Sequence, residues 1–260
     1  MTQRVGLIGL GAIGRAVVRI TRERYPNEIE IVGALVRDAA RPRPDGPTVV
    51  GELAALLECR PEVVVEVAGH QALRAHGPAV LRAGLDLIAV SVGALAEPAV
   101  EEQLRAAASA GGARLRIASG AIGALDAIAA AAVGGLERVT HTTRKPARTL
   151  LAPEEAAGLT AERELFRGPA REGVRLFPES VNVAAAVSLA GIGLDRTELR
   201  VIADPTIERN RHEVVAEGAF GTLRFEIANV PSDDNPRSGR IVAMSIVHEL
   251  LARRASVTIG

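Results

Sequence analysis

The sequence predicts an α/β protein with a doubly wound parallel sheet in its first half and a second, α+β domain with a mixed or antiparallel sheet and helices. Two observations support this class. Short apolar runs alternate with helical stretches up to about Gly120, as in a parallel sheet covered on both faces. After Gly120 the rhythm changes, and longer runs with alternating polarity appear.

The apolar runs of the first half predict five strands: Val5–Ile8, Ile29–Leu35, Val63–Val67, Leu87–Val90 and Leu115–Ile117. The stretches between them predict four helices: Ala12–Arg22, Glu52–Glu58, Gln71–Ala83 and Pro98–Ala110. Arg37–Pro47 is rich in proline and arginine, which favours a loop after the second strand.

The second half predicts an Ala-rich helix and then a strand, Leu125–Val133 and Leu136–Lys145, with another helix near Val181–Leu189. Its remaining strands are expected at Leu199–Ala203, His212–Glu217 and Thr222–Ala228. We therefore expect a first domain over 1–120, a catalytic and dimerisation domain over 121–238, and a C-terminal segment, 239–260, whose helix packs back on the first domain.

Composition excludes several classes of protein. Lys plus Arg and Asp plus Glu both number 31, which argues against nucleic acid or an anionic membrane as the main partner. The single cysteine, Cys59, permits neither an intrachain disulfide nor a multi-cysteine metal cage, and we expect no metal. No signal peptide or membrane span is evident, so the expected compartment is the cytoplasm.

A glycine-rich turn, Gly9-Leu10-Gly11-Ala12-Ile13-Gly14, follows the first predicted strand and opens the first helix. Gly9 allows the tight turn, Gly11 lets a pyrophosphate approach the backbone, and Gly14 lets helix and strand pack closely. The helix N-terminus then offers N–H groups and a favourable dipole to the phosphates. This context predicts a Rossmann-type domain that binds NAD or NADP.

Small residues end three of the later strands, at Ala68-Gly69, Ser91-Val92-Gly93 and Ser119-Gly120-Ala121. A cofactor lying across the carboxyl ends of the strands needs such residues, although ordinary turns also use them. The second strand is followed by Arg37 where an NAD-specific site usually has Asp or Glu. Arg37, with Arg41 and Arg43, is either a site for the 2′-phosphate of NADP or a solvated basic loop.

Candidate catalytic groups outside this turn are His70, Lys145, Asn182, His212 and the loop Pro231–Ser238. Alternation along the strand Leu136–Lys145 sends Lys145 to the side of His141 and Thr143, and Arg144 to the opposite side. Pattern alone does not choose among these groups.

An ordered series of motifs along essentially the whole chain resembles the L-aspartate dehydrogenase family. Besides the glycine turn, the motifs are Val67-Ala68-Gly69-His70, Ser91-Val92-Gly93-Ala94-Leu95, Gly120-Ala121-Ile122-Gly123, Arg144-Lys145-Pro146, Asn182-Val183-Ala184-Ala185, Ala203-Asp204-Pro205, His212 through Gly218-Ala219-Phe220-Gly221, and Asn235-Pro236. The resemblance implies that His212 is the active-site histidine and that Ala121 and Asn182 contact the cofactor. It also implies oxidation of L-aspartate to iminoaspartate with NAD or NADP, a homodimer, and a possible role in NAD biosynthesis.

The expected site residues fall into three groups. Catalytic residues are His212 and Lys145, and substrate-binding residues are His70, Arg144, Ser232 and Asn235. The cofactor-binding residues are Gly9, Gly11, Ala12, Ile13, Gly14, Arg37, Ala68, Gly69, Ser91, Val92, Ala121 and Asn182. Two carboxylates on the substrate call for cations and neutral donors, and a base such as His212 is needed because an ammonium group does not readily release hydride from its carbon.

Two alternatives stay open. One is another two-domain oxidoreductase, either homoserine-dehydrogenase-like or of the sugar type, although sugar-type enzymes commonly have Glu-Lys-Pro where this chain has Arg144-Lys145-Pro146. The other is a non-catalytic regulator that binds NAD(P)H, which would need the glycine turn but neither His212 nor Lys145.

Overall fold

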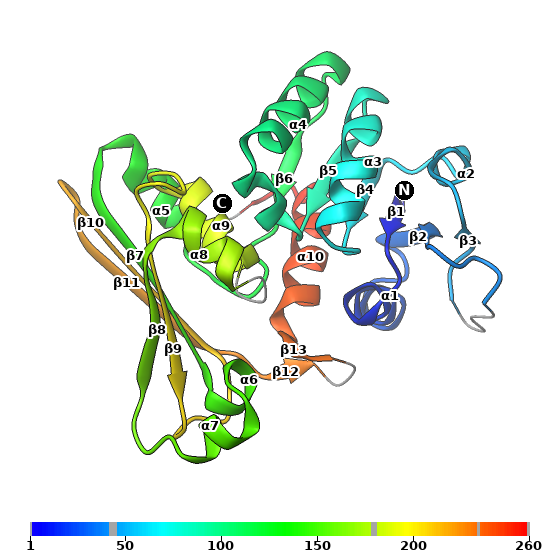
Figure 1. Cartoon of the computed structure of the whole chain (residues 1–260). Helices are drawn as coiled ribbons and strands as arrows, with labels where there is room; N and C mark the ends of the chain where they lie inside the picture. The colour runs from blue at the N-terminus through cyan, green and yellow to red at the C-terminus, as the bar shows by residue number, and fades with distance from the viewer. Residues whose placement is uncertain (1, 42–45, 178–180, 233–234, 259–260) are drawn as a thin grey trace. The chain divides into compact units, whose positions relative to one another are not determined.

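The computed structural model describes residues 2–41, 46–177, 181–232 and 235–258. The chain forms two compact units (Figure 1). The first unit comprises Met1–Gly120 and Val242–Gly260, and the second comprises Ala121–Ile241.

The first unit contains a six-stranded sheet in the order β3-β2-β1-β4-β5-β6, in which all neighbouring strands are parallel. The strands are β1 (Gln3–Ile8), β2 (Ile29–Leu35), β3 (Val49–Val50), β4 (Val63–Glu66), β5 (Asp86–Ala89) and β6 (Leu115–Ile117). The chain steps outward from β1 to β3 and then returns to β4, so the strand order reverses between β1 and β4. In open parallel sheets, ligands bind outside the carboxyl ends of the strands at such a reversal.

The first unit is completed by the helices α1 (Ala12–Arg24), α2 (Leu53–Glu58), α3 (His70–Arg82), the 3-10 helix η1 (Val92–Ala96), α4 (Pro98–Gly111) and α10 (Ile241–Ala252). α10 is linked by ion pairs to β5 and β6, at one end of the strand order. Glu249 pairs with Arg116 of β6, and Arg253 pairs with Asp86 of β5. Ile246 and Leu250 of α10 are fully buried, so apolar packing holds the helix in this unit more than the ion pairs do.

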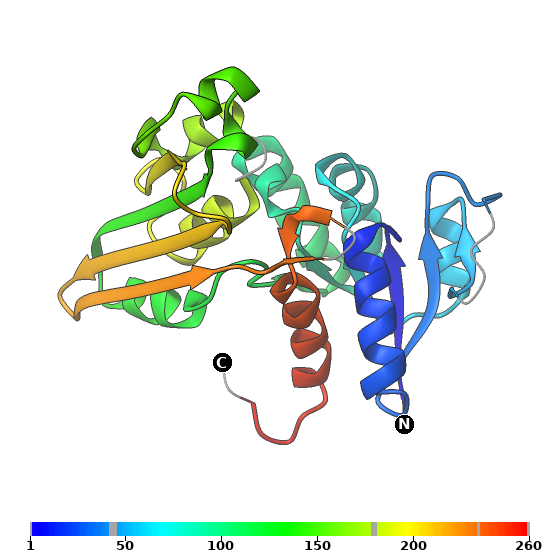
Figure 2. The same cartoon turned by 90° about the horizontal axis from the view of Figure 1, so that it is seen from below.

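The second unit contains a five-stranded sheet in the order β11-β10-β7-β9-β8. The strands are β7 (Leu136–Pro146), β8 (Arg163–Pro169), β9 (Glu198–Asp204), β10 (Arg211–Gly218) and β11 (Gly221–Ala228). β7 and β9 are parallel and the other pairs are antiparallel, so the sheet is mixed. Figure 2 shows the long hairpin β10–β11. A second hairpin pairs β12 (Pro231–Ser232) with β13 (Asn235–Gly239).

One face of this mixed sheet is apolar and covered. The remaining helices are α5 (Leu125–Val133), α6 (Ala147–Leu150), α7 (Pro153–Ala157), α8 (Ala170–Leu176) and α9 (Val181–Ala190). Ile128 of α5 and Val187 of α9 form one core cluster with Val139 and Val214 of the sheet. The opposite face carries ion pairs, including Arg200 with Glu164 and Arg224 with Glu213.

The predicted fold class is confirmed: a doubly wound parallel sheet is followed by an α+β unit with a mixed sheet. The elements that sequence reasoning missed are short or amphipathic, namely β3, η1, α6, α7, β8, α8 and the hairpin β12–β13. In β8, charged and apolar residues alternate around an irregularity between Glu164 and Phe166, so no continuous pattern marks the strand.

Candidate active site

The glycine turn of the first unit has the geometry that its spacing predicts. Gly9 has a φ of +103°, and a Cβ there would lie 2.8 Å from the Cβ of Ala68. A Cβ on Gly14 would lie 2.5 Å from the carbonyl oxygen of Gly9. A Cβ on Gly11 would meet nothing within 4 Å. Gly9 and Gly14 are therefore required by the fold, whereas Gly11 keeps open the space in front of the backbone.

The first turn of α1 is suited to an anion. Gly11 is the N-cap, so no side chain caps the helix, and no acidic residue lies in the first turn. The first N–H groups of a helix lack intrahelical partners and attract phosphate through the helix dipole. The open space at Gly11 and these N–H groups together fit the pyrophosphate of a dinucleotide. Ala12 and Ile13, which begin the helix, are half-buried.

A buried carboxylate, Glu66, organises the turns after β4 and β5. Its Oε1 accepts hydrogen bonds from the backbone N–H groups of Ala68 (2.7 Å) and Gly69 (2.9 Å) and from the hydroxyl of Ser91 (2.9 Å). Its Oε2 accepts one from the N–H of Ser91 (3.2 Å). Burial raises the pKa of Glu66, and the hydrogen bonds from Ala68, Gly69 and Ser91 oppose that rise. Glu66 thus holds three predicted cofactor-binding residues together.

Sequence reasoning did not single out Glu66, although a signal was present. The acid lies within an otherwise apolar run, Val63–Val67, that reads as a buried strand. A charged group at a buried position must be satisfied by hydrogen bonds, so its neighbours are expected to be organised around it.

The other predicted cofactor residues are spread over both units. In the first, Val92 is buried and begins η1, and Arg37 is exposed after β2. Arg41 is also exposed, and Arg43 lies outside the described residues. In the second, the carbonyl of Ala121 accepts a hydrogen bond from Asn229 (2.9 Å), and Asn182 lies in the first turn of α9.

The buried face of the second unit brings together the two predicted catalytic residues. Register places His212 of β10 opposite Thr143 of β7, and Lys145 lies two residues further along β7 on the same face. Lys145 is 4% exposed and His212 is 5% exposed. His141, on this same face, completes the group: its Nε2 lies 3.2 Å from Nδ1 of His212.

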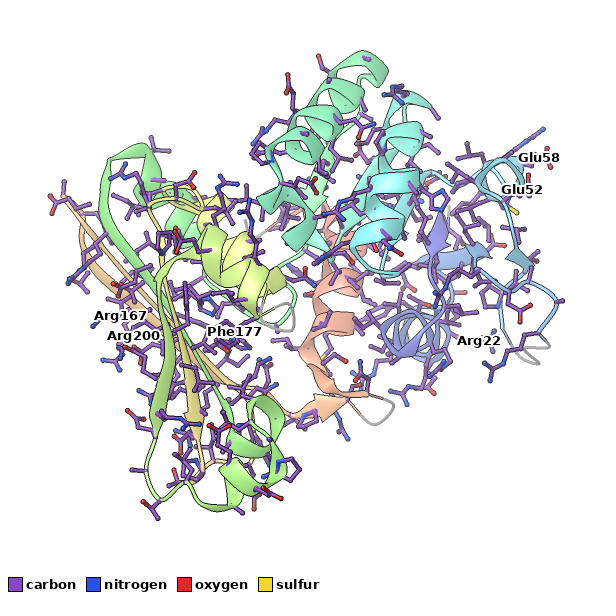
Figure 3. All side chains as sticks on the ribbon, viewed as in Figure 1. Arg22, Glu52, Glu58, Arg167, Phe177 and Arg200 are labelled. Carbon is purple, nitrogen blue, oxygen red and sulfur yellow. The ribbon has the colours of Figure 1, made fainter. Side chains whose placement is uncertain are left out.

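Arg144 is not brought to this face. It projects from the opposite side of β7, where it forms an ion pair with Glu162. Figure 3 shows the same division of the sheet, with Arg167 and Arg200 on one side and Phe177 on the other. Of the two neighbouring cations, Lys145 is the one that shares a face with His212.

The remaining predicted substrate residues lie in separate elements. His70 begins α3 in the first unit, directly after Gly69. Ser232 and Asn235 belong to the hairpin β12–β13 of the second unit, where the Ser232 hydroxyl donates to the carbonyl of Asn235 (3.1 Å) and accepts from its N–H (3.2 Å).

Burial keeps both histidines of the second unit uncharged at neutral pH. The pKa of His212 falls to about 3, because burial penalises the imidazolium and the charge of Lys145 repels it. The pKa of His141 is also well below its usual range, because of burial and the proximity of His212. At pH 7 the two rings are therefore neutral and form a hydrogen bond rather than repelling each other.

These shifts predict an acid-sensitive fold. In the unfolded chain a histidine has a pKa of about 6.5. Below that pH the unfolded state binds a proton that the buried ring in the folded state does not bind. The free energy of unfolding should therefore be highest above about pH 6.5. It should decrease as the pH is lowered below that value, by up to about 1.4 kcal/mol per pH unit for each histidine. Urea unfolding at pH 7, 6 and 5 measures this pH dependence. His212→Asn is the comparison, because the contribution of carboxylates such as Glu66 is the same in both proteins and cancels in the difference. Equal slopes in the two proteins would contradict the prediction.

Comparison with known proteins assigns the chain to a family. An L-aspartate dehydrogenase of Ruegeria pomeroyi is 44% identical over 98% of this chain and 94% of its own length. L-aspartate dehydrogenase 2 of Bordetella bronchiseptica is 40% identical over the whole of both chains. The chain belongs to the L-aspartate dehydrogenase family. The family model for the C-terminal part of aspartate dehydrogenase matches residues 126–253, and that for the NAD-binding domain of homoserine dehydrogenase matches residues 9–118.

Solved structures agree with this membership of the L-aspartate dehydrogenase family. An aspartate dehydrogenase from Thermotoga maritima superposes over the whole of both chains with a TM-score of 0.84 at 25% identity. A hyperthermophilic archaeal homoserine dehydrogenase matches with a TM-score of 0.64 at 10% identity, which shows a shared fold alone. The homoserine-dehydrogenase-like alternative is therefore compatible with the fold. The sequence identity of 40% and 44% to L-aspartate dehydrogenases over nearly the whole chain favours that family instead.

Among the described residues, no helix has the length and apolar character needed to cross a bilayer. Within the same part of the chain, no three His, Cys, Asp or Glu side chains are grouped as metal ligands.

Proposed function

We propose that this protein oxidises L-aspartate to iminoaspartate with NAD or NADP. Water then adds to the imine, and ammonia leaves to give oxaloacetate. The observation that carries the proposal is the identity of at least 40% to L-aspartate dehydrogenases over essentially the whole chain. The buried group formed by His212 and Lys145 supports it with chemistry suited to an amino acid.

We propose that the first unit holds the cofactor. Gly9, Gly11 and Gly14 with the first turn of α1 would take the pyrophosphate, and the turns organised by Glu66 would lie under the rest of the dinucleotide. When bound, the cofactor supplies an acceptor for the hydride that leaves the α-carbon of the amino acid. Ala121 and Asn182 of the second unit are the further cofactor contacts implied by the family.

We propose that His212 and Lys145 carry the reaction from the second unit. The ammonium group of aspartate must lose a proton before its carbon can release hydride, and the imine must later gain one as water attacks. His212 is a buried neutral imidazole that can hydrogen-bond the reacting nitrogen through its remaining ring nitrogen. The ammonium of Lys145 attracts a substrate carboxylate, and His70, Ser232 and Asn235 are the proposed neutral or weakly basic donors.

A panel of amino acids tests the function. We expect NAD(P)H absorbance to rise with L-aspartate and to stay at background with homoserine, L-glutamate, L-alanine and D-aspartate. The initial rate should increase with pH as more of the substrate becomes unprotonated amine. A signal with homoserine alone would favour the homoserine-type alternative, and cofactor binding with no turnover on any substrate would favour a regulator.

Arg37 is proposed to accept the 2′-phosphate of NADP. Arg37→Ala should weaken NADP binding by about tenfold, as expected for loss of one charge-assisted contact, and leave NAD binding unchanged. Isothermal titration with each cofactor measures this. Arg22→Ala, in the last turn of α1, is the matched control and should change neither affinity. An equal loss for both cofactors, or for neither, would remove Arg37 from the site.

We also propose that the enzyme is a homodimer of the cytoplasm and that it feeds NAD biosynthesis. The family resemblance is the support for all three statements. Light scattering gives the mass in solution, and a monomer at working concentration would contradict the first of them.

A further inference from the structure

Nδ1 of His212 has an unusual hydrogen-bond partner. A catalytic histidine commonly has its second nitrogen bound to a carboxylate or a backbone carbonyl, and that bond selects the tautomer. Here Nδ1 of His212 faces Nε2 of another histidine, His141, at 3.2 Å. The ring centroids lie 5.4 Å apart and the ring planes are inclined by 21°, so the two rings meet edge to edge through this contact.

Only one of the two nitrogens in this contact can donate, because both rings are neutral. If His212 donates from Nδ1, then Nε2 of His141 accepts, and the proton of His141 must sit on its Nδ1. If His141 donates from Nε2, its Nδ1 is a bare lone pair and the proton of His212 sits on Nε2. The surroundings of His141 Nδ1 therefore decide the direction.

His141 Nδ1 is buried and has no hydrogen-bond partner among the described residues. His141 itself is 0% exposed, and its register neighbours are the apolar Val214 and Leu199. The hydroxyl of Thr143, two residues along on the same face, is also buried without a partner in the described part of the chain, so it does not serve this nitrogen. A buried N–H without an acceptor is rarer in proteins than an acceptor without a donor.

We infer that His141 is a positioning residue that donates from its Nε2 to Nδ1 of His212 and so holds His212 in the Nε2–H tautomer. His212 then has no lone pair to offer the substrate in the resting enzyme. It presents an N–H, and the amine of the substrate must arrive already deprotonated or lose its proton to another group. The tautomer is a property of the folded chain, and only this catalytic consequence rests on the proposed function.

Nitrogen-15 NMR reads the tautomer directly. In ¹⁵N-histidine-labelled protein at pH 7, without substrate, long-range proton–nitrogen spectra distinguish protonated from bare ring nitrogens. The chain has five histidines, and loss of signals in His212→Asn and in His141→Gln assigns the two rings. We expect His212 to show a protonated Nε2 and a bare Nδ1, and His141 to show the same pattern.

Two variants of His141 test the positioning role. His141→Gln keeps an N–H donor at nearly the same distance from the backbone, whereas His141→Phe keeps the ring shape and removes the donor. We expect His212 to stay in the Nε2–H form in His141→Gln and to populate both tautomers in His141→Phe. The kcat should fall at least tenfold in His141→Phe and by less than threefold in His141→Gln, with the dissociation constant of the cofactor unchanged in both.

A protonated Nδ1 on His212 in the wild type would overturn the inference. So would equal loss of kcat in the two variants when both unfold cooperatively at wild-type urea concentrations. If His141→Phe does not fold, the wild-type and His141→Gln spectra still decide the tautomer. A wild type with the expected spectra but no turnover of aspartate would contradict the proposed function and leave the tautomer assignment standing.

Discussion

Replacing His212 with alanine is expected to lower kcat for aspartate oxidation by about 10²- to 10³-fold, the usual cost of removing one polar group that hydrogen-bonds the reacting atoms. The dissociation constant of NAD or NADP should stay within about twofold of the wild type, because the glycine turn and α1 lie in the first unit and His212 lies in the second. Steady-state kinetics and cofactor titration, with folding monitored by urea unfolding, measure the two effects separately.

His248→Ala is the matched control for this experiment, since it removes an exposed histidine from α10. It should leave kcat at the wild-type value. Wild-type turnover in His212→Ala would remove His212 from the reaction. A combined loss of turnover and cofactor affinity would indicate that the residue supports the fold rather than the chemistry.

Gly11→Ala should separate cofactor binding from stability more cleanly than any other glycine change in the turn. A Cβ at this position meets nothing within 4 Å, and its φ of −77° and ψ of −160° suit alanine, so the fold should tolerate it. The methyl group would occupy the space proposed for the pyrophosphate. We expect cofactor affinity to fall by at least about tenfold, which corresponds to 1.4 kcal/mol, with an unchanged free energy of unfolding.

Gly51→Ala provides the control in the same unit, because its Cβ would make only an ordinary contact of 3.8 Å with Ala39. It should change neither affinity nor stability. Gly14→Ala should instead destabilise the first unit, since its Cβ would lie 2.5 Å from the Gly9 carbonyl oxygen. Unchanged cofactor affinity in Gly11→Ala would place the dinucleotide elsewhere.

Local pattern was enough to predict most elements of the first unit. Ile29–Leu35 and Leu115–Ile117 were predicted with the bounds that the structure shows, because each is a short, mostly apolar run, the usual sequence signal of a strand in a covered parallel sheet. The two-residue β3 and the charged β8 were missed because neither has a run long enough to give a period.

The site was predictable in its parts but not in its connections. Alternation along β7 placed Lys145 with His141 and Thr143, as the structure shows. The contact between His141 and His212 depends on the register of β7 against β10, which pairs residues about 70 positions apart, and no local pattern specifies that register. Glu66 accepts hydrogen bonds from Ser91, which lies in the turn after the neighbouring strand β5, and this long-range pairing is equally invisible to a local pattern.

The path of the chain has a consequence for how this protein can be divided. The polypeptide leaves the dinucleotide-binding unit at Gly120, builds the whole of the other unit, and returns at Val242 to lay down α10. During synthesis, some 120 residues of the second unit are therefore made before α10 is available to complete the first unit. Only then can Ser245 bond to Gly120, Glu249 pair with Arg116, and Arg253 pair with Asp86. A simple truncation cannot isolate the nucleotide-binding half. A version that joins Gly120 to Val242 through a short linker would keep α10 and its ion pairs with Arg116 and Asp86 in one continuous chain.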